Sequence, residues 1–365
     1  MHENDNMLIL LNQYPPPSAV YRYAYDIQHA VEGSVLYTFL YGSSKNTLPS
    51  YSQGQYVQGK FKRVKVLNKL FPNFSHQPFI KNLNEIAGAE SILHYASPMI
   101  PFKVPSISRV VTILDPPSFL LNTDLFSNNS SMVPIANLLQ KKFQSHYLES
   151  FKKFSNVITV SNYLRSAILE EGFTENTKVI YPCIPPSFKL LQEKKLLKEK
   201  LGLPLNKICV LSVSSMLKRK NLSMVKKTME LLGDYFKLVR VGTPITADNI
   251  SFENISYEQL NIIYNACDVM LFPSLYEGFG YPLVEAFATG LPVVASDIEV
   301  FRETSGGNAA ILRDPNDAVS LAEGVRSALE SSEDLIKIGL KRAERFSFER
   351  FGSDMNEYYK NLISH

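Results

Sequence analysis

The stretch VMLFPSLYEGFGYPLVEAFATGLPVVAS, residues 269–296, places two short apolar runs around a glycine-containing loop and a helical segment. A strand, a helix and a second strand in this order are typical of a parallel sheet covered by helices. Gly278 and Gly280 permit positive φ in the loop, and Pro282 suits the first position of a helix that we expect to end at Thr289. The stretch therefore predicts part of a doubly wound α/β domain.

The same alternation of short apolar runs and helical segments recurs along the chain. The other apolar runs are MLILLN (7–12), RVVTILD (109–115), NVITVS (156–161), ICVLSVS (208–214) and LVRVG (238–242). Short continuous apolar runs that end at polar or turn residues suit the strands of a buried parallel sheet. The pattern predicts an α/β protein with two doubly wound domains.

A proline-rich segment divides the chain. VIYPCIPPSFK, residues 179–189, has three prolines in five positions, which neither a helix interior nor an internal strand tolerates. A length of 365 residues also suits two domains, since a domain usually has about 100–200 residues. We expect an N-terminal domain over 1–182, a linker over 183–190 and a C-terminal domain over 191–345. The tail, 346–365, predicts an amphipathic helix that packs back toward the N-terminal domain.

The composition argues against several classes of protein. A net charge of +3 is too small by itself to indicate a nucleic acid partner. The three cysteines are scattered without neighbouring histidines, which argues against a zinc site or a disulfide framework and fits a reducing compartment. No apolar run approaches the roughly 18 residues of a membrane span, and the segment MHENDNMLILLNQ is acidic where a signal peptide is basic. We therefore expect a cytoplasmic protein.

A basic segment lies in the predicted N-terminal domain. GKFKRVKVLNKLF, residues 59–71, mixes basic and large apolar residues at near-helical spacing. One interpretation is an amphipathic helix over Lys60–Lys69 that lies on an anionic surface, giving peripheral contact with the inner membrane face. The alternatives are a solvated helix face and a site for an anionic acceptor. The sequence leaves these open.

Two glutamates flank the glycine-containing loop at the predicted carboxyl edge of the C-terminal sheet. Ligands of open α/β sheets bind at this edge, so the cleft between the two domains is the expected active site. The N–H groups that begin the next helix suit an anion such as a pyrophosphate. Glu277 then lies in the loop, and Glu285, expected in the first helical turn, suits the vicinal hydroxyls of a sugar. The alternative is structural, because the helix dipole favours a glutamate in the first turn by about 0.3–1 kcal/mol.

A cationic motif follows the first strand of the C-terminal domain. SVSSMLKRKNLSMV places Arg219 and Lys220 just before a helix that we expect to start near Asn221. Cations are unfavourable at a helix start, so their presence needs a reason. At the carboxyl edge of the sheet they suit a clamp on a leaving diphosphate, which is a strong electrostatic contribution to catalysis. The alternative is a basic helix start with no further role.

Taken together, these motifs resemble glycosyltransferase family four, the retaining glycosyltransferases with a GT-B fold. The family's signature is two glutamates separated by seven residues around a Gly-Phe-Gly turn, as in Glu277, GFGYPLV and Glu285. Its Arg-Lys-Asn segment resembles Arg219-Lys220-Asn221, and its PxEA helix resembles PLVEA. Further similar segments are SYEQLNIIYNACDVMLFPS, VITVSNYLRSAIL, DPNDAVSLAEGV and FSFERF. The resemblance implies two Rossmann-like domains that face each other across a cleft, with the acceptor bound by the first and the nucleotide sugar by the second.

The resemblance also implies roles for the donor-side residues. Arg219 and Lys220 would bind the donor diphosphate and offset its negative charge as it leaves. Glu285 would hold the ribose hydroxyls, and Glu277 would contact the transferred sugar, so that Glu277, Arg219 and Lys220 form the implied catalytic set. The Gly-Phe-Gly turn would offer backbone N–H groups to the β-phosphate and the sugar. The remaining donor-side residues are Ser215, Gly242, Gly278, Phe279, Gly280 and Tyr281.

On the acceptor side the match to the family is less complete. SAVYRYAYDI resembles the family's glycine-rich opening loop, so Arg22 would face the phosphate or the acceptor. Asp115 resembles the aspartate of the family's His-Asp pair. The chain departs from the family at Ser18–Tyr21, where glycines are usual, at Leu114, where many members have a histidine, and at Ser215, which is often arginine.

From this resemblance we expect a hexosyltransferase that moves a hexose-type sugar from a UDP- or GDP-linked donor to a hydroxyl of a glycan or lipid-linked acceptor, with retention at the anomeric carbon. The C-terminal loops contain no DxD-like acidic cluster, so we expect neither a metal nor a cofactor beyond the donor. Two alternatives are a sugar-nucleotide epimerase and a donor-binding scaffold without turnover, the latter suggested by the altered segment Ser18–Tyr21. The base, the sugar and the acceptor are not encoded in a readable motif.

Overall fold

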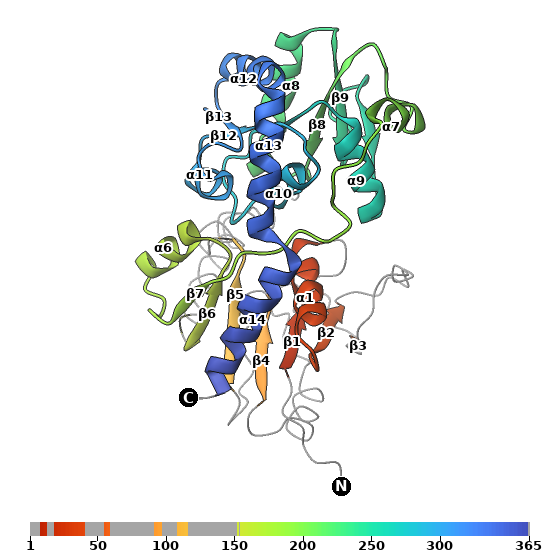
Figure 1. Cartoon of the computed structure of the whole chain (residues 1–365). Helices are drawn as coiled ribbons and strands as arrows, with labels where there is room; N and C mark the ends of the chain where they lie inside the picture. The colour runs from red at the N-terminus through yellow and green to blue at the C-terminus, as the bar shows by residue number, and fades with distance from the viewer. Residues whose placement is uncertain are drawn as a thin grey trace, which may run out of the picture. The chain divides into compact units, whose positions relative to one another are not determined.

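The structure of the protein is a computed structural model that describes residues 8–12, 18–40, 55–58, 91–96, 108–115, 152 and 154–363. The chain divides into two compact units, each with its own sheet (Figure 1). The first unit comprises Met1–Tyr181 and Phe351–His365, and the second unit comprises Pro182–Arg350.

The sheet of the first unit has parallel strands in the order β3-β2-β1-β4-β5-β6-β7. These strands are β1 (Leu8–Asn12), β2 (Val35–Leu40), β3 (Gln55–Gln58), β4 (Ile92–Tyr95), β5 (Ser108–Ile113), β6 (Asn156–Thr159) and β7 (Thr177–Val179). In the centre of the sheet, Leu10 pairs with Leu36 on one side and with His94 on the other, and all three are fully buried. The strand order reverses direction at β1 and β4, as in a doubly wound sheet.

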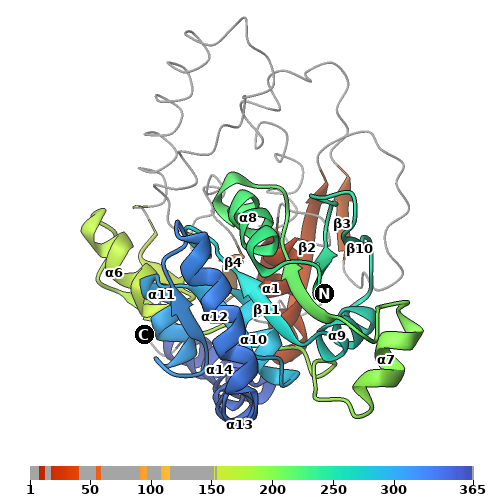
Figure 2. The ribbon, with the colours of Figure 1, turned by 90° about the horizontal axis from the view of Figure 1, so that it is seen from above.

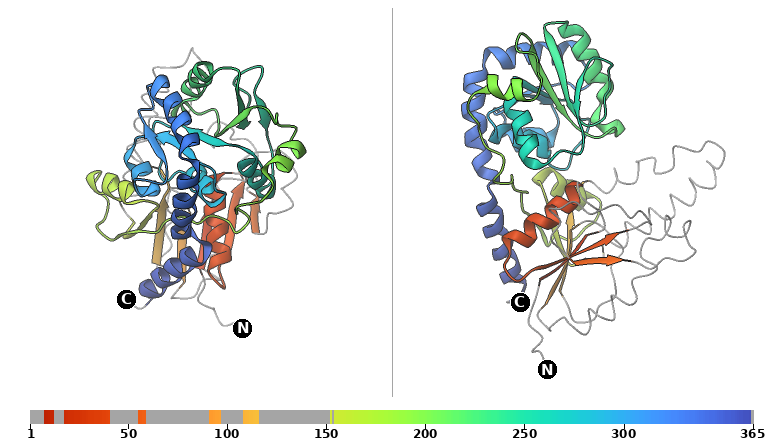
Figure 3. Two further views of the ribbon diagram at one scale, coloured as in Figure 1. Left: turned by 45° about the horizontal axis from the view of Figure 1, so that its top comes forward. Right: turned by 90° about the vertical axis from the view of Figure 1, so that its right-hand side faces the viewer.

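Helix α1 (Ala19–Ala30) follows β1 and packs on β1 and β2 (Figure 3). It begins at Ser18, whose Oγ accepts a hydrogen bond of 3.1 Å from the N–H of Tyr21. A serine in this position stabilises a helix start. The segment Ser18–Tyr21, which resembles the family's opening loop, forms the cap and the first turn of α1 in this chain.

Two more helices of the described chain belong to the first unit, α6 (Asn162–Glu170) and, from Phe351 onward, α14 (Phe348–Ile363). The ring of Phe351 packs edge-on against Tyr23 of α1, with 5.8 Å between the ring centroids. The side-chain amide of Asn356 donates a hydrogen bond of 3.0 Å to the carbonyl of Ala30. These contacts attach the end of the chain to its beginning.

The sheet of the second unit is also parallel, in the order β10-β9-β8-β11-β12-β13. Its strands are β8 (Ile208–Val213), β9 (Phe236–Val241), β10 (Ile250–Phe252), β11 (Val269–Phe272), β12 (Val293–Ser296) and β13 (Ile311–Arg313). Its helices are α7 (Lys194–Lys200), η1 (Lys218–Lys220), α8 (Leu222–Leu232), α9 (Tyr257–Ala266), α10 (Tyr281–Ala288), α11 (Glu299–Ser305), α12 (Ala318–Glu330), α13 (Ser332–Ala343) and η2 (Glu344–Phe346). The predicted α/β class with two doubly wound parallel sheets is confirmed.

An apolar core fixes the strands of the second unit. Helices α8 and α12 lie side by side over one face of the sheet (Figure 2). Val225 of α8 and Leu321 of α12 pack with Val210 and Leu271 of the two central strands, and all four are fully buried. Burial of apolar surface stabilises by about 25 cal/mol per Å². This core holds the ends of β8 and β11 in place, and the candidate site begins at those ends.

Candidate functional site

Two loops meet at the carboxyl edge of the second sheet, one after β8 and one after β11. These strands are neighbours and parallel, so both chains leave the sheet at the same edge. The N–H of Leu275, in the loop after β11, donates a hydrogen bond of 2.8 Å to the carbonyl of Arg219, in the segment after β8. The strand order and this hydrogen bond bring the two sequence motifs together.

Glu277 lies between two cations at this edge. Arg219 donates from Nη1 to Oε2 of Glu277 at 2.6 Å and to the carbonyl of Tyr276 at 3.2 Å. Lys220 donates from Nζ to the other carboxylate oxygen, Oε1. The exposed fractions of the three side chains are 15% for Arg219, 11% for Lys220 and 7% for Glu277, so the ion pairs are largely protected from solvent screening. The cluster of Arg219, Lys220 and Glu277 carries a net charge of one positive unit.

The cations keep Glu277 ionised. Burial raises the pKa of its carboxyl, but the charges and hydrogen bonds of Lys220 and Arg219 outweigh burial, so the pKa lies below its ordinary value of 4.5. At neutral pH the group is a carboxylate that accepts hydrogen bonds and cannot donate a proton. The cluster therefore suits a ligand that combines an anion with hydroxyl groups.

Local backbone geometry aims Arg219 and Lys220 at this edge. Asn221 follows η1 in the left-handed region, at φ 53°, which Asn adopts more readily than most residues. Its side-chain amide donates a hydrogen bond of 2.7 Å to the carbonyl of Pro315, which fixes the turn before α8. The guanidinium of Arg219 lies 5.6 Å from the ring centroid of Tyr276, within cation–π range.

Gly280 forms the turn into α10. Its φ is 93°, and a Cβ at this position would lie 2.7 Å from Cε1 of Phe301, so a larger residue would be strained and would collide. No side chain caps the start of α10, and Gly280 itself is the N-cap. The N–H groups of a helix start without a side-chain cap suit an anion. This arrangement places an anion-binding helix end beside the loop that contains Glu277.

Glu285 is buried in α10, with an exposed fraction of 3%. Its Oε2 accepts a hydrogen bond of 2.7 Å from the hydroxyl of Tyr264, on α9. The expectation that Glu285 lies in the first helical turn is wrong, because α10 starts at Tyr281 and has no acidic residue in that turn. Glu285 is instead the fifth residue of the helix, where Tyr264 rather than the helix start supports it.

Ser215 and Gly242 lie at the ends of β8 and β9. Ser215 is exposed in the segment between β8 and η1. Gly242 directly follows β9, with φ 125°, and a Cβ there would lie 2.4 Å from the carbonyl oxygen of Ser214. Glycine is therefore required at 242 for the two strand ends to lie so close together. Both residues lie at the same edge of the sheet as Glu277.

Some buried polar residues at this edge were missed by sequence reasoning. Ser274 follows β11, and Ser296 is the last residue of the neighbouring strand β12. Both are fully buried, and within the described chain their hydroxyl oxygens have no hydrogen-bond partner. Arg240, near the end of β9, is also fully buried. A buried polar group without a partner destabilises the fold, so such groups at one edge indicate a polar ligand or bound water there. The signal in the sequence was an arginine inside the otherwise apolar run LVRVG.

The first unit holds the two predicted acceptor-side residues. Arg22 is buried in α1, with its Nε 3.8 Å from Oδ2 of Asp26, one helical turn away. Asp115 is half-buried and follows β5, and Leu114 precedes it. Strand β1 leads to Arg22, and strand β5 leads to Asp115. These two strands are not neighbours, because β4 lies between them.

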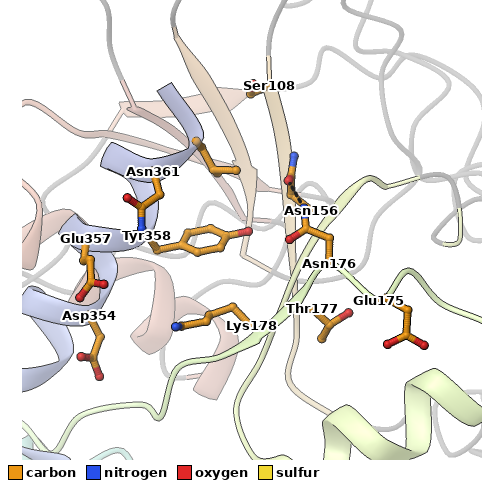
Figure 4. A pocket seen from close by; sticks show the side chains of 11 residues that line it. Ser108, Asn156, Glu175, Asn176, Thr177, Lys178, Asp354, Glu357, Tyr358 and Asn361 are labelled. Carbon is orange, nitrogen blue, oxygen red and sulfur yellow. Dashed lines mark hydrogen bonds between the residues drawn. The ribbon is translucent and has the colours of Figure 1, made fainter. Parts of the chain in front are cut away.

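A cavity of about 490 Å³ lies in the first unit, away from all the predicted site residues. Its lining includes Ser108, Asn156 and Thr177, which are the first residues of β5, β6 and β7. Figure 4 shows Tyr358 of α14 pointing toward Asn156. The cavity is therefore at the amino ends of the strands, the edge opposite to the one where ligands of open α/β sheets bind.

Three expectations concern metals and membranes. Within the residues that the structure describes, no group of three His, Cys, Asp or Glu side chains is arranged to hold a metal ion. In the same part of the chain, no helix has the length and apolar character needed to cross a membrane. The basic segment Lys60–Lys69 lies outside the described residues.

Comparison with known proteins places the site within a recognised family segment. Residues 193–345 match the family described as glycosyl transferases group 1. The O-antigen chain mannosyltransferase B of Escherichia coli is 34% identical over 108 residues, which are 29% of this chain and 28% of that protein. The O-antigen chain mannosyltransferase RfbU of Salmonella typhimurium is 27% identical over 231 residues, 58% of this chain and 62% of that protein. The matches thus span less than two thirds of each of these relatives.

A solved structure matches nearly the whole chain. The crystal structure of Anabaena Alr3699/HepE in complex with UDP and glucose superposes with a TM-score of 0.74 at 17% identity, covering 97% of this chain and 99% of that one. At this level of identity the match establishes the fold.

Proposed function

We propose that this chain, whose residues 193–345 match the glycosyl transferases group 1 family and whose two parallel sheets have the GT-B fold, is a retaining glycosyltransferase. It would transfer a hexose-type sugar from a nucleoside diphosphate sugar to an acceptor hydroxyl. The observation that carries the proposal is the buried cluster of Arg219, Lys220 and Glu277 at the carboxyl edge of the second sheet.

In the proposed reaction the two cations stabilise the leaving diphosphate. An ammonium group has three N–H donors, and the bond to Glu277 occupies one of those of Lys220, so the others suit phosphate oxygens. The net positive charge of the cluster offsets negative charge as the bond between the anomeric carbon and the phosphate oxygen breaks. With Arg219, Lys220 and the start of α10 in these roles, a metal ion is not required to neutralise the leaving group.

Glu277 positions rather than attacks. Both of its oxygens accept hydrogen bonds from cations, which lowers their reactivity toward the anomeric carbon. We therefore favour front-face substitution. The acceptor oxygen forms a bond to the anomeric carbon on the face from which the phosphate oxygen leaves, and the acceptor proton passes to that phosphate oxygen. Because attack and departure share one face, the configuration at the anomeric carbon is retained.

The relatives suggest where to look for donor and acceptor. The two mannosyltransferases act on O-antigen chains by their names, and Alr3699/HepE was crystallised with UDP and glucose. For this chain we propose a UDP- or GDP-linked hexose as donor and a hydroxyl of a glycan or lipid-linked glycan as acceptor.

A donor screen tests the proposal. UDP-hexoses and GDP-mannose are incubated with the protein, with and without glycan or lipid-linked glycan acceptors, and release of nucleoside diphosphate and the anomer of the product are measured. The expected result is release that depends on an acceptor, a product with the donor's anomeric configuration and no effect of EDTA. Conversion of the donor without an acceptor would establish the epimerase alternative. Donor binding without release under any condition would establish the scaffold alternative.

A further inference from the structure

Arg240 is a fully buried arginine in the second unit, on the penultimate position of β9. Its Nη1 donates hydrogen bonds of 3.0 Å to the hydroxyls of Ser212 and Ser214, and its Nη2 donates one of 2.9 Å to the carbonyl of Ser214. All the acceptors are neutral, and among the described residues its Nε has no acceptor. Arg240 therefore differs from Arg219, which pairs with a carboxylate.

A buried charge without a counter-ion is unfavourable for the fold. Burial lowers the pKa of Arg240 from its ordinary value, yet a guanidinium remains protonated in proteins. An apolar side chain of similar size would avoid the loss of hydration. A positive charge kept at this position therefore suits a function that uses an anion.

Arg240 lies near the carboxyl edge of the second sheet, where the donor is proposed to bind. Its register partner is Ser212 of β8, and Ser214 begins the segment that leads to the cations of η1. A Cβ at Gly242 would lie 2.4 Å from the Ser214 carbonyl and 3.1 Å from Nη2 of Arg240, so these three residues form one packed group. Gly242 belongs to this group, and Ser215 directly follows its member Ser214. The family resemblance places both Gly242 and Ser215 on the donor side.

We infer that Arg240 is a positioning residue for the nucleotide donor, which holds the backbone of Ser214 and Gly242 in the shape that receives the donor. Its charge, which has no carboxylate partner among the described residues, favours the donor's diphosphate over the bare nucleoside. The inference rests on the proposed function. It differs from a purely structural role, in which Arg240 only joins the ends of β8 and β9. A structural role predicts equal losses for charged and uncharged ligands.

The test compares UDP and GDP with uridine and guanosine, by calorimetric titration of the full chain. Arg240→Met is expected to weaken diphosphate binding about 10-fold and nucleoside binding less than about 3-fold, and to raise the donor KM without lowering kcat by more than about 3-fold. Arg240→Lys keeps the charge and is expected to recover most of the diphosphate affinity. Equal losses for diphosphates and nucleosides, or no rescue by lysine, would overturn the inference.

Ser214→Ala gives a second test with less risk to folding, since it leaves the charge in place and removes one acceptor of Arg240. We expect the donor KM to rise about 3-fold at unchanged kcat, and the melting temperature to fall only slightly, because Nη1 of Arg240 keeps its hydrogen bond to the hydroxyl of Ser212. An unchanged KM would count against the inference. If the parental protein binds neither UDP nor GDP, the proposed function itself fails, which is a separate outcome.

Discussion

In the second unit Glu277 is buried between two cations, whereas in the first unit His94 is buried between two hydroxyl groups. His94 bonds to the hydroxyl of Tyr359 at 2.5 Å and to Oγ1 of Thr112 at 2.7 Å. Burial lowers the pKa of His94 to about 3 and raises that of Tyr359, so both groups are neutral at neutral pH. Glu277, by contrast, has a lowered pKa and stays charged because its partners are charged.

The difference shows how to separate function from support among buried polar groups. Neutral hydrogen-bonded pairs such as His94 and Tyr359 join α14 to β4 without burying net charge. Buried ion pairs are weak evidence for stability, because well-packed apolar residues often replace them without loss. Where a fold keeps such a cluster at a ligand-binding edge, its charge is best explained by the ligand.

The largest expected effect is that of removing one cation from the second unit. Lys220→Ala should lower kcat by about 10²–10³-fold, because one electrostatic donor to the leaving group is lost. The melting temperature should stay close to the parental value, since the remaining Arg219 still pairs with Glu277. Steady-state kinetics with the donor identified by the screen, together with a thermal melt, check both points.

Lys226→Ala is the matched control, because Lys226 lies on α8 close to Lys220 in sequence but is exposed, and its ion pair with Glu230 is long at 4.0 Å. It should change kcat by less than about 2-fold, as surface ion pairs contribute about 0–1 kcal/mol. Near-normal turnover of Lys220→Ala would remove the phosphate role and, with it, the functional side of the comparison.

The second expected effect is a loss of stability in the first unit at mildly acidic pH. The ordinary pKa of histidine is 6.5 and that of His94 is about 3, so the unfolded chain binds one more proton than the folded chain between these values. The contribution of His94 to the free energy of unfolding is therefore constant above about pH 6.5. Below this pH it falls by roughly 1.4 kcal/mol per pH unit, a loss of about 2 kcal/mol at pH 5. Hydrogen exchange of peptides from Phe351–Ile363, corrected for the intrinsic rate, measures this opening.

The second unit should behave differently over the same range. Glu277 has a lowered pKa, so its stabilising contribution is present above the ordinary value of 4.5 and is lost only as the pH falls below it. Peptides of α10 should thus keep their protection between pH 7 and pH 5. In His94→Gln the decline in the first unit should disappear even if its stability is lower throughout. A decline of the same size in that variant would show that other groups cause it.

The central part of the site could be predicted because its residues are close in sequence to clear strand patterns. Arg219, Lys220 and Glu277 each follow an apolar run, and parallel strands bring the ends of such runs to one edge. The error at Glu285 arose from the helix start, since one residue of difference at Tyr281 moved the glutamate out of the first turn. Helix boundaries depend on capping contacts that a local pattern specifies only to within a residue or two.

Other features have no local signal. The strands β10 and β13 have three residues each, lie at the two edges of the second sheet and are half-buried, so they lack the continuous apolar run that marks the central strands. The partners His94 and Tyr359 are 265 positions apart, and only the packing of α14 brings them together. Ser18 resembled part of a loop because its role as a cap depends on the backbone of Tyr21.

The smallest expected effect concerns Glu285, which shares one feature with Glu277 and another with His94. It is a buried acidic residue of the second unit, like Glu277, but it accepts a hydrogen bond from a neutral tyrosine hydroxyl, and His94 also bonds to such a hydroxyl. Tyr264→Phe removes that hydrogen bond, and we expect weaker binding of UDP or GDP by about 3–10-fold with kcat nearly unchanged. Since Glu285 is proposed to hold the ribose, nucleoside and diphosphate affinities should fall together, unlike the result expected for Arg240→Met.

Tyr235→Phe, at a position with an exposed fraction of 65%, is the control and should bind normally. If Tyr264→Phe lowers only the melting temperature and leaves nucleoside binding intact, Glu285 belongs with the structural pairs, and a charged partner becomes the criterion that separates the two groups.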